Sequence, residues 1–593
     1  MMNRARNGWL SLLTACLPLI AFAAEPPASP DAARVSLQWG VKIPMRDGVR
    51  LNATVYTPKG QQAPAPCIFT LTPYIAQSYH DRGVYFAAHG LPFLTVDVRG
   101  RGNSEGVFRP LIQEARDGYD VVEWLARQPY CNGKVSMWGG SYAGYDQWAT
   151  AKEFPPHLAT IVPAAAPYIG VDFPSRGNIF DPYLVQWLTF TSGHTSQINI
   201  FGDQAFWNTR NLQWLESGAP FKDLDERVGN PLPVFQEWIS HPAIDAYWDA
   251  YNPTAEQYAK LGIPILTITG SYDDDQPGAL AHYREYMKHA SAEGAARHYL
   301  IIGPWDHAGT RTPQAQVGGL TFGAASLLDL PRLHLDWYAW TMQGGAKPEF
   351  LKKRVAYYVM QADEWRYADS LEAVTAQHKP LYLDSATGAS DVLASGSLQP
   401  VLAKGKPDQY RYDPRDLGTA RLEMGLDPGS LTDQTLVFAR SGKQLVYHSA
   451  AFDKDTELSG FFKLSAWIGI DQPDTDLVVS VSEIRTDGSA IRLSEDRLRA
   501  RYRQGLRQAQ LIQSSSPLQY DFSHFNFTSR LIGKGSRLRL VISPVDSIYG
   551  QRNYQSGKDV SAETAQDART VTVTLYHDRT HPSALYIPIA QPE

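Results

Sequence analysis

The segment "GKVSMWGGSYAGYDQW", residues 133–148, places a serine where an apolar run meets a helix-like segment. A serine on such a sharp turn projects its hydroxyl above a sheet, where it can act as a nucleophile. Gly139 and Ala143, two residues before and after Ser141, are small enough for strand and helix to approach each other. The usual G-x-S-x-G pattern is altered, because Ala143 replaces the second glycine and Gly144 follows. A glycine–serine turn without chemistry is the alternative.

Two downstream segments supply the partners that a nucleophilic serine needs. Serine becomes reactive when a histidine removes its proton and a carboxylate orients that histidine. The apolar segment "PILTITGSYD" ends at Asp273, and "HYLIIGPWDH" ends at His307. The chain order serine, aspartate, histidine is the one found with this kind of turn. We therefore predict a catalytic triad of Ser141, Asp273 and His307.

Acyl transfer also requires hydrogen-bond donors for the oxyanion of the tetrahedral intermediate. The main-chain N–H of Tyr142, directly after the serine, is the first candidate. The second is expected in the loop after an early strand, where "FTLTPYIAQ" places Tyr74. A phenol hydroxyl can donate, although the position of Tyr74 alone also fits a core aromatic residue.

Alternating strand and helix patterns indicate the scaffold that must position these residues. Residues 35–171 and 259–345 predict a mainly parallel sheet covered by helices on both faces, with sites at the carboxyl ends of the strands. Residues 172–258 are helix-like and rich in tryptophan, which indicates an inserted helical cap. From about residue 350 short strands replace helices, "RVAYYVM" being the first, so residues 350–590 predict an all-β sandwich.

The N-terminus has the features of a cleavable signal peptide, residues 1–23. Arg4 and Arg6 precede an apolar run, and Ala21-Phe22-Ala23 is an A-x-A cleavage signature. The run is short for a membrane span, so we predict a soluble periplasmic or secreted protein. A lipoprotein anchored through Cys16 is the alternative.

Charge and cysteine content limit the partners. A net charge of -6 gives no reason to expect binding to nucleic acid. Cys67 and Cys131 lack metal-ligand spacing, so no metal site is predicted, and whether they form a disulfide is left open.

The motifs "TPY", "DVRGRGNSEG", "GGSYAGY", "GSYD" and "GPWDH", in this order, resemble the CocE/NonD hydrolases. This group includes cocaine esterases, glutaryl acylases and α-amino-acid ester hydrolases, and is related to X-Pro dipeptidyl-peptidases. Residues 456–503 resemble its C-terminal β-domain. The resemblance implies an α/β-hydrolase core, a helical cap and a jelly-roll-like sandwich. It also implies Ser141 as nucleophile, His307 as base and acid, Asp273 as its orienter, and Tyr74 and Tyr142 as the oxyanion hole.

Several residues near these motifs have competing interpretations. Asp274 and Asp275 could bind a substrate amine, as the resemblance to α-amino-acid ester hydrolases suggests, but Pro277 marks a helix start where acids are ordinary partners. The cap tryptophans either wall an acyl pocket or pack helices together; the pocket candidates are Trp187, Trp207 and Trp214. "DVRGRGNSEG" lacks the Lys-Ser/Thr of a phosphate loop and is interpreted as structural.

Together these features predict an exported serine hydrolase acting without a cofactor on esters or amides of small to medium acyl groups. The alternatives are an exopeptidase of the X-Pro dipeptidyl-peptidase type, which needs a group to hold the substrate's N-terminal ammonium, and a non-catalytic binding module. The natural substrate and any homo-oligomeric state are left open.

Overall fold

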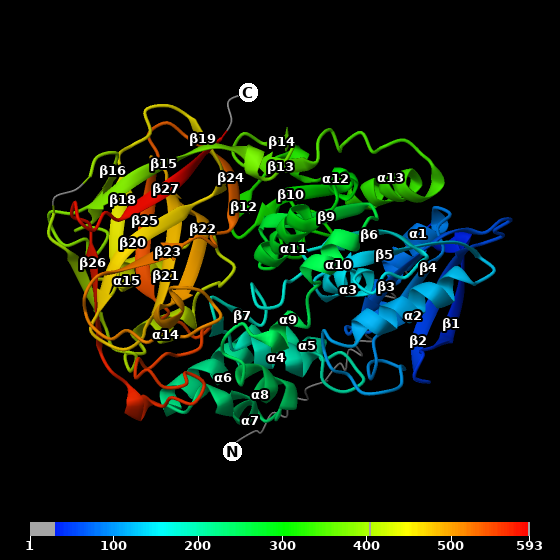
Figure 1. Ribbon diagram of the computed structural model, residues 1–593, viewed down its shortest axis with the longest axis horizontal. Helices are drawn as coiled ribbons and strands as arrows, with labels where there is room; N and C mark the ends of the chain where they lie inside the picture. The colour runs from blue at the N-terminus through cyan, green and yellow to red at the C-terminus, as the bar shows by residue number, and fades with distance from the viewer. Residues whose placement is uncertain (1–29, 403–404, 591–593) are drawn as a thin grey trace, which may run out of the picture.

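The computed structural model describes residues 30–402 and 405–590 of the chain. Figure 1 shows three parts, namely an α/β region, a group of short helices beside it, and a C-terminal β region. The predicted signal peptide, with Cys16, lies outside the described residues. Within them, no helix is long and apolar enough to cross a membrane.

A ten-stranded sheet forms the centre of the α/β region, in the order β1-β2-β4-β3-β5-β6-β9-β10-β13-β14. At its first edge, β1 (Val35–Pro44) pairs antiparallel with β2 (Arg50–Pro58). The strands from β4 to β13 run parallel to one another, and β14 closes the edge antiparallel to β13. These strands are β3 (Ala65–Thr72), β4 (Phe93–Asp97), β5 (Cys131–Gly140), β6 (Leu158–Ala164), β9 (Ile265–Tyr272), β10 (His298–Asp306), β13 (Val355–Val359) and β14 (Glu364–Ala368).

Helices cover both faces of this sheet. Successive residues of a strand point to opposite faces, and on β5 both faces are buried. On β5, Met137 is buried in the cluster that holds the apolar residues of α2 (Glu114–Ala126) and α3 (Tyr142–Ala151). The next residue, Trp138, packs on the other face with residues of α1 (His80–Ala88) and α13 (Leu330–Gln343).

The predicted helical cap is observed between β6 and β9, after the two short strands β7 (Ser175–Arg176) and β8 (Ile179–Phe180). It is drawn in teal to green below the sheet in Figure 1. Its helices are α4 (Tyr183–Phe190), α5 (Ile198–Phe201), α6 (Gln204–Ser217), α7 (Leu224–Val228), α8 (Pro233–Ile239), α9 (Ala246–Asp249) and α10 (Ala255–Lys260).

The C-terminal region is a β domain of 13 strands. From Leu477 onward, exposure alternates residue by residue along β21 (Asp476–Ile484), the pattern of a strand with one buried face. The other strands are β15 (Thr375–Asp384), β16 (Gly396–Gln399), β17 (Asp408–Tyr412), β18 (Leu445–Ser449), β19 (Thr456–Phe461), β20 (Lys463–Ile470), β22 (Ala490–Arg499), β23 (Leu518–Phe522), β24 (Phe527–Ile532), β25 (Arg537–Pro544), β26 (Val571–Tyr576) and β27 (Ala584–Ala590).

The β domain was predicted to start at about residue 350, and this boundary is wrong: the hairpin of β13 and β14 still belongs to the α/β sheet. "RVAYYVM" forms β13, which lies parallel to β10 in the α/β sheet, and β14 also belongs to that sheet. A short apolar strand reads the same in either domain, and only its pairing partner decides between them. The first strand of the β domain is β15, which begins at Thr375.

The β domain also holds the segment that follows β9. Gln276, at the start of α11 (Gln276–His289), exchanges two hydrogen bonds with the main chain of Phe527 on β24. Both residues are buried. The loop at residues 273–275 is therefore fixed by two domains.

Candidate active site

The turn that carries Ser141 has strained backbone geometry. Ser141 lies between the end of β5 and the start of α3 with φ 60° and ψ -128°. Few residues other than glycine adopt such angles, and they do so mainly where the strain serves a site. A Cβ at Gly139 would lie 2.6 Å from the Ala143 Cβ, and one at Gly144 would lie 2.4 Å from the Ala164 oxygen. The small residues around the serine are therefore required by the close approach of strand and helix.

Asp273 and His307 follow the neighbouring parallel strands β9 and β10 and meet at their carboxyl ends. His307 Nδ1 lies 2.8 Å from Asp273 Oδ1. The carboxylate also accepts hydrogen bonds from the Thr269 hydroxyl at 2.8 Å and the Asp275 main-chain N–H at 3.1 Å. Asp273 is 1% exposed, so it is held rigidly. This arrangement places the proton on Nδ1 and leaves Nε2 as the basic nitrogen.

The surroundings of His307 change its basicity in two opposing ways. Burial disfavours the imidazolium and lowers the pKa of His307, but the hydrogen bond and negative charge of Asp273 outweigh burial. The net pKa of His307 therefore lies above its usual value of 6.5. The imidazole suits proton transfer near neutral pH.

A cavity of about 890 Å³ opens at this end of the sheet, and Ser141, His307 and Tyr74 all line it. Much of its wall is aromatic and comes from the cap, namely Tyr183, Trp187, Phe190 and Phe201. The volume is in the range of small-molecule sites. Among the described residues, no hydrogen bond joins the Ser141 hydroxyl to His307, an arrangement common in unliganded sites whose contacts tighten with substrate.

Tyr74 follows β3 and points its hydroxyl into the cavity beside Ser141. Its oxygen accepts a hydrogen bond from Trp187 Nε1 at 3.1 Å, so its own hydrogen remains available for donation. Its ring stacks on Phe190, with 5.2 Å between the ring centroids. Burial raises the pKa of Tyr74, while the side chains of Trp187 and Ser141 act in the opposite direction. The phenol therefore stays protonated.

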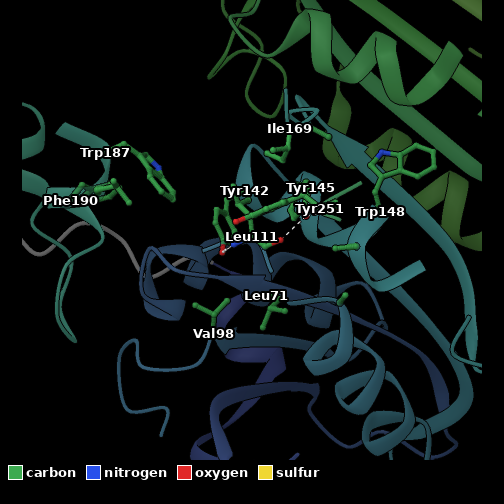
Figure 2. Close-up of a cluster of buried hydrophobic side chains, with 14 of the residues drawn as sticks. Leu71, Val98, Leu111, Tyr142, Tyr145, Trp148, Ile169, Trp187, Phe190 and Tyr251 are labelled. Atoms are coloured by element: carbon green, nitrogen blue, oxygen red, sulfur yellow. Dashed lines mark hydrogen bonds between the residues drawn. The ribbon is translucent and has the colours of Figure 1, made fainter. Parts of the chain in front are cut away.

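Tyr142 directly follows Ser141 but does not itself line the cavity, and its side chain is buried in the core. As the first residue of α3, it has a main-chain N–H with no partner within the helix. Its hydroxyl donates to Glu114 and accepts from the Leu111 main-chain N–H at 2.7 Å. The ring packs nearly parallel to Trp187, with 5.9 Å between centroids (Figure 2). These contacts hold the N–H beside Ser141 in place.

Comparison with known proteins identifies relatives over nearly the whole chain. The model of the X-Pro dipeptidyl-peptidase (S15 family) matches residues 47–309, and that of the X-Pro dipeptidyl-peptidase C-terminal non-catalytic domain matches residues 350–586. Cocaine esterase of Rhodococcus sp. (strain MB1 Bresler) is 26% identical, across 93% of this chain and 98% of its own. A putative serine esterase of Mycobacterium bovis is 24% identical, across 93% of this chain and 95% of its own. Over nearly its whole length the chain is therefore similar to serine hydrolases of the CocE/NonD and X-Pro dipeptidyl-peptidase group.

Solved structures agree on the family's fold. An α-amino acid ester hydrolase superposes with a TM-score of 0.80 at 21% identity, covering 97% of this chain and all of its own. A CocE/NonD family hydrolase from Staphylococcus aureus superposes with a TM-score of 0.66 at 17% identity, covering 94% of this chain and 93% of its own. The α/β-hydrolase core with a C-terminal β domain is thereby shown.

The family's "DVRGRGNSEG" segment has a structural position here. Asp97 accepts a hydrogen bond from the Ala76 main-chain N–H at 2.7 Å. The fully buried Arg101 donates to the carbonyls of Pro73 at 2.8 Å and of Thr195 at 3.0 Å. The segment thus ties the loop that carries Tyr74 to the cap.

The three cap tryptophans predicted as pocket residues have different positions. Trp187 lines the cavity. Trp207 and Trp214 do not, and the prediction for these two is corrected: each is 1% exposed and donates its indole N–H within the cap, to the carbonyls of Ile200 and Ala219 respectively. They pack the cap helices together.

Asp274 and Asp275 do not line this cavity either. Asp275 Oδ2 lies 3.8 Å from His307 Nδ1, and burial raises the pKa of Asp275 well above its ordinary value. Asp274 faces a separate small cavity that Arg492 and Glu495 also line.

Several residues of the site had no signal in the sequence. Arg311, four residues after His307, lines the cavity, as do the aromatic side chains of Tyr183, Phe190 and Phe201. Their contacts join segments far apart in the chain, and no local pattern distinguishes them from core or surface residues. Cys67 and Cys131, left open above, are both buried free thiols.

Proposed function

We propose that the protein cleaves esters or amides of small to medium acyl groups through an acyl-enzyme at Ser141. One observation carries the proposal: a strained serine, a histidine bound to a buried aspartate, and a protonated phenol converge on one aromatic-walled cavity. Similarity to serine hydrolases over nearly the whole chain supports the reaction class.

In the first step, His307 Nε2 removes the Ser141 proton while Oγ bonds to the substrate carbonyl carbon. The resulting oxyanion accepts hydrogen bonds from the Tyr74 hydroxyl and the Tyr142 N–H. The intermediate collapses, the bond to the leaving oxygen or nitrogen breaks, and His307 gives its proton to that atom. Water, deprotonated by His307, then attacks the acyl-enzyme and restores Ser141.

The cavity's composition favours an esterase or acylase over an exopeptidase. No Asp or Glu is among the described residues that line it, so the substrate's free ammonium would have no charged partner there. Because the chain matches the S15 models, dipeptide substrates remain the alternative to test. The N-terminal residues 1–23 further support the proposal that the enzyme acts outside the cytoplasm.

Labelling with a fluorophosphonate probe tests the nucleophile. The probe should modify the wild type and leave Ser141→Ala unmodified, and the same variant should lose hydrolysis of 4-nitrophenyl acetate and butyrate. Ala-Pro-4-nitroanilide is assayed in parallel. Labelling that persists in Ser141→Ala contradicts the assignment, and faster turnover of the dipeptide anilide than of all esters and amides contradicts the proposed substrate class.

A further inference from the structure

The substrate cavity contains an arginine and no opposing acid. Arg311 is the one guanidinium among the described residues that line it, and no Asp or Glu lines it. Within the described chain, Arg311 forms no ion pair; its recorded side-chain hydrogen bond is from Nη1 to the Thr310 hydroxyl at 3.3 Å. An arginine side chain carries its positive charge at all working pH values. Because no carboxylate is among the described lining residues, no negative side chain of the cavity wall balances that charge.

A second guanidinium strengthens the positive charge at this wall. Arg82 donates to the Arg311 carbonyl at 3.2 Å and to the Thr312 hydroxyl at 2.8 Å, and it lies 5.5 Å from the centre of the Trp138 ring. Burial lowers the pKa of Arg82, and the positive charge of Arg311 lowers it further. Asp81 offsets part of the charge of Arg82, but neither arginine forms an ion pair with another described residue, so the pair creates a local positive potential that attracts an anion.

The guanidinium of Arg311 lies close to the reacting serine. A Cβ built on Gly140 would be 2.3 Å from Arg311 Nη1, so the arginine lies over the residue directly before Ser141. Since consecutive Cα atoms are about 3.8 Å apart, Nη1 is within roughly 10 Å of the Ser141 hydroxyl. A substrate bound covalently at Ser141 can therefore reach Arg311 across a few bonds.

The position of Arg311 relative to His307 indicates which half of the substrate it faces. The Arg311 main-chain N–H donates to the carbonyl of Ala308 at 3.1 Å and closes a turn directly after His307. Arg311 and His307 therefore belong to the same loop. His307 must lie on the side of the leaving atom, to which it returns the proton. The aromatic cap wall, on Trp187 and Phe190, is left for the acyl group.

We propose that the leaving group of the preferred substrate carries a carboxylate, which Arg311 binds beside Gly140. The substrate class is then an ester or amide whose alcohol or amine half is an acid, with an uncharged acyl half. This inference rests on the proposed function and narrows its substrate.

Two matched ester pairs test the inference. 4-Acetoxybenzoate and 4-acetoxybenzamide place a carboxylate or a neutral amide on the leaving phenol; phenyl hydrogen succinate and phenyl butyrate vary the charge on the acyl side. For each pair the ratio of kcat/KM, anionic over neutral, is compared between wild type and variant, which cancels intrinsic reactivity. Arg311→Met should lower the leaving-side ratio roughly 10- to 100-fold, the range for hydrogen bonds to charged groups. Arg311→Lys should retain most of it.

A control separates local binding from net charge. Arg109→Met removes an exposed arginine paired with Glu237, so its ratio should change less than about twofold. An unchanged leaving-side ratio in Arg311→Met overturns the inference, and a larger shift in the acyl-side ratio overturns the assignment to the leaving group. If wild type and Arg311→Met still hydrolyse 4-acetoxybenzamide through Ser141 while the ratio stays constant, the inference alone fails. If Ser141→Ala hydrolyses it as well as wild type, the proposed function fails.

Discussion

Replacing Trp187 by phenylalanine tests whether the cap takes part in the chemistry. The indole N–H of Trp187 donates to the Tyr74 hydroxyl, the group proposed to stabilise the oxyanion. A phenol whose oxygen already accepts a hydrogen bond is a stronger donor through its own O–H, because linked hydrogen bonds polarise one another. Phenylalanine keeps an aromatic wall and removes the donor.

The expected loss follows from two magnitudes. An oxyanion-hole donor is worth about 2.7–4 kcal/mol in kcat, and a neighbouring hydrogen bond in a chain strengthens it by about 10–30%. Trp187→Phe should therefore cost about 0.3–1.2 kcal/mol, which is roughly a 1.7- to eightfold decrease in kcat. Tyr74→Phe removes the donor itself and should lower kcat about 10²- to 10³-fold.

The assay is steady-state hydrolysis of 4-nitrophenyl acetate, with kcat and KM determined separately. Trp207→Phe is the matched control, since it also removes the hydrogen bond of a cap indole, in this case to the Ile200 carbonyl at 2.7 Å, away from the cavity. Its kcat should stay within twofold of the wild type. Trp187→Phe is also measured in a Tyr74→Phe background, where its effect on kcat should disappear.

Two results would refute the reasoning. One is an effect of Trp187→Phe that is the same with and without the Tyr74 hydroxyl, which would mean that Trp187 acts by shape alone. The other is a change confined to KM, which would place Trp187 in ground-state binding.

Three further predictions concern the turn, the triad and a buried acid. Because His307 must be neutral to act as a base, kcat/KM of the wild type should rise with pH, and the midpoint of this rise should lie above pH 6.5. Asp273→Asn should lower that midpoint and reduce kcat about 10⁴-fold. A midpoint that the substitution does not move would contradict the assignment. Gly144→Ala should destabilise by about 1–3 kcal/mol in denaturant unfolding, because its Cβ meets a main-chain oxygen, whereas Gly262→Ala, with open space around its Cβ, should not. Burial raises the pKa of Glu114 from 4.5 to about 8, so its stabilising contribution is lost as pH rises through that interval. Glu114→Gln should therefore reduce the fall in Tm between pH 5 and 8, and an identical slope would count against a buried protonated acid.

Much of the fold was predictable because it depends on local rules. The parallel core follows from strand and helix periods, and the elbow at Ser141 follows from small residues within five positions of one another. Asp273 and His307 each directly follow an apolar strand, and neighbouring parallel strands deliver such residues to one edge of a sheet. Each of these features is encoded in about ten consecutive residues.

Only the tertiary structure decided which of several equivalent residues reach the cavity. Trp187, Trp207 and Trp214 have similar helical settings, yet only Trp187 faces Tyr74, 113 residues away. The strand formed by "RVAYYVM" belongs to the first sheet because it pairs with β10. The position of the Arg311 side chain depends on its packing over Gly140. The amino-acid sequence by itself determined the chemistry available to this protein; the long-range packing, which no local period encodes, decided the walls and charge of the site.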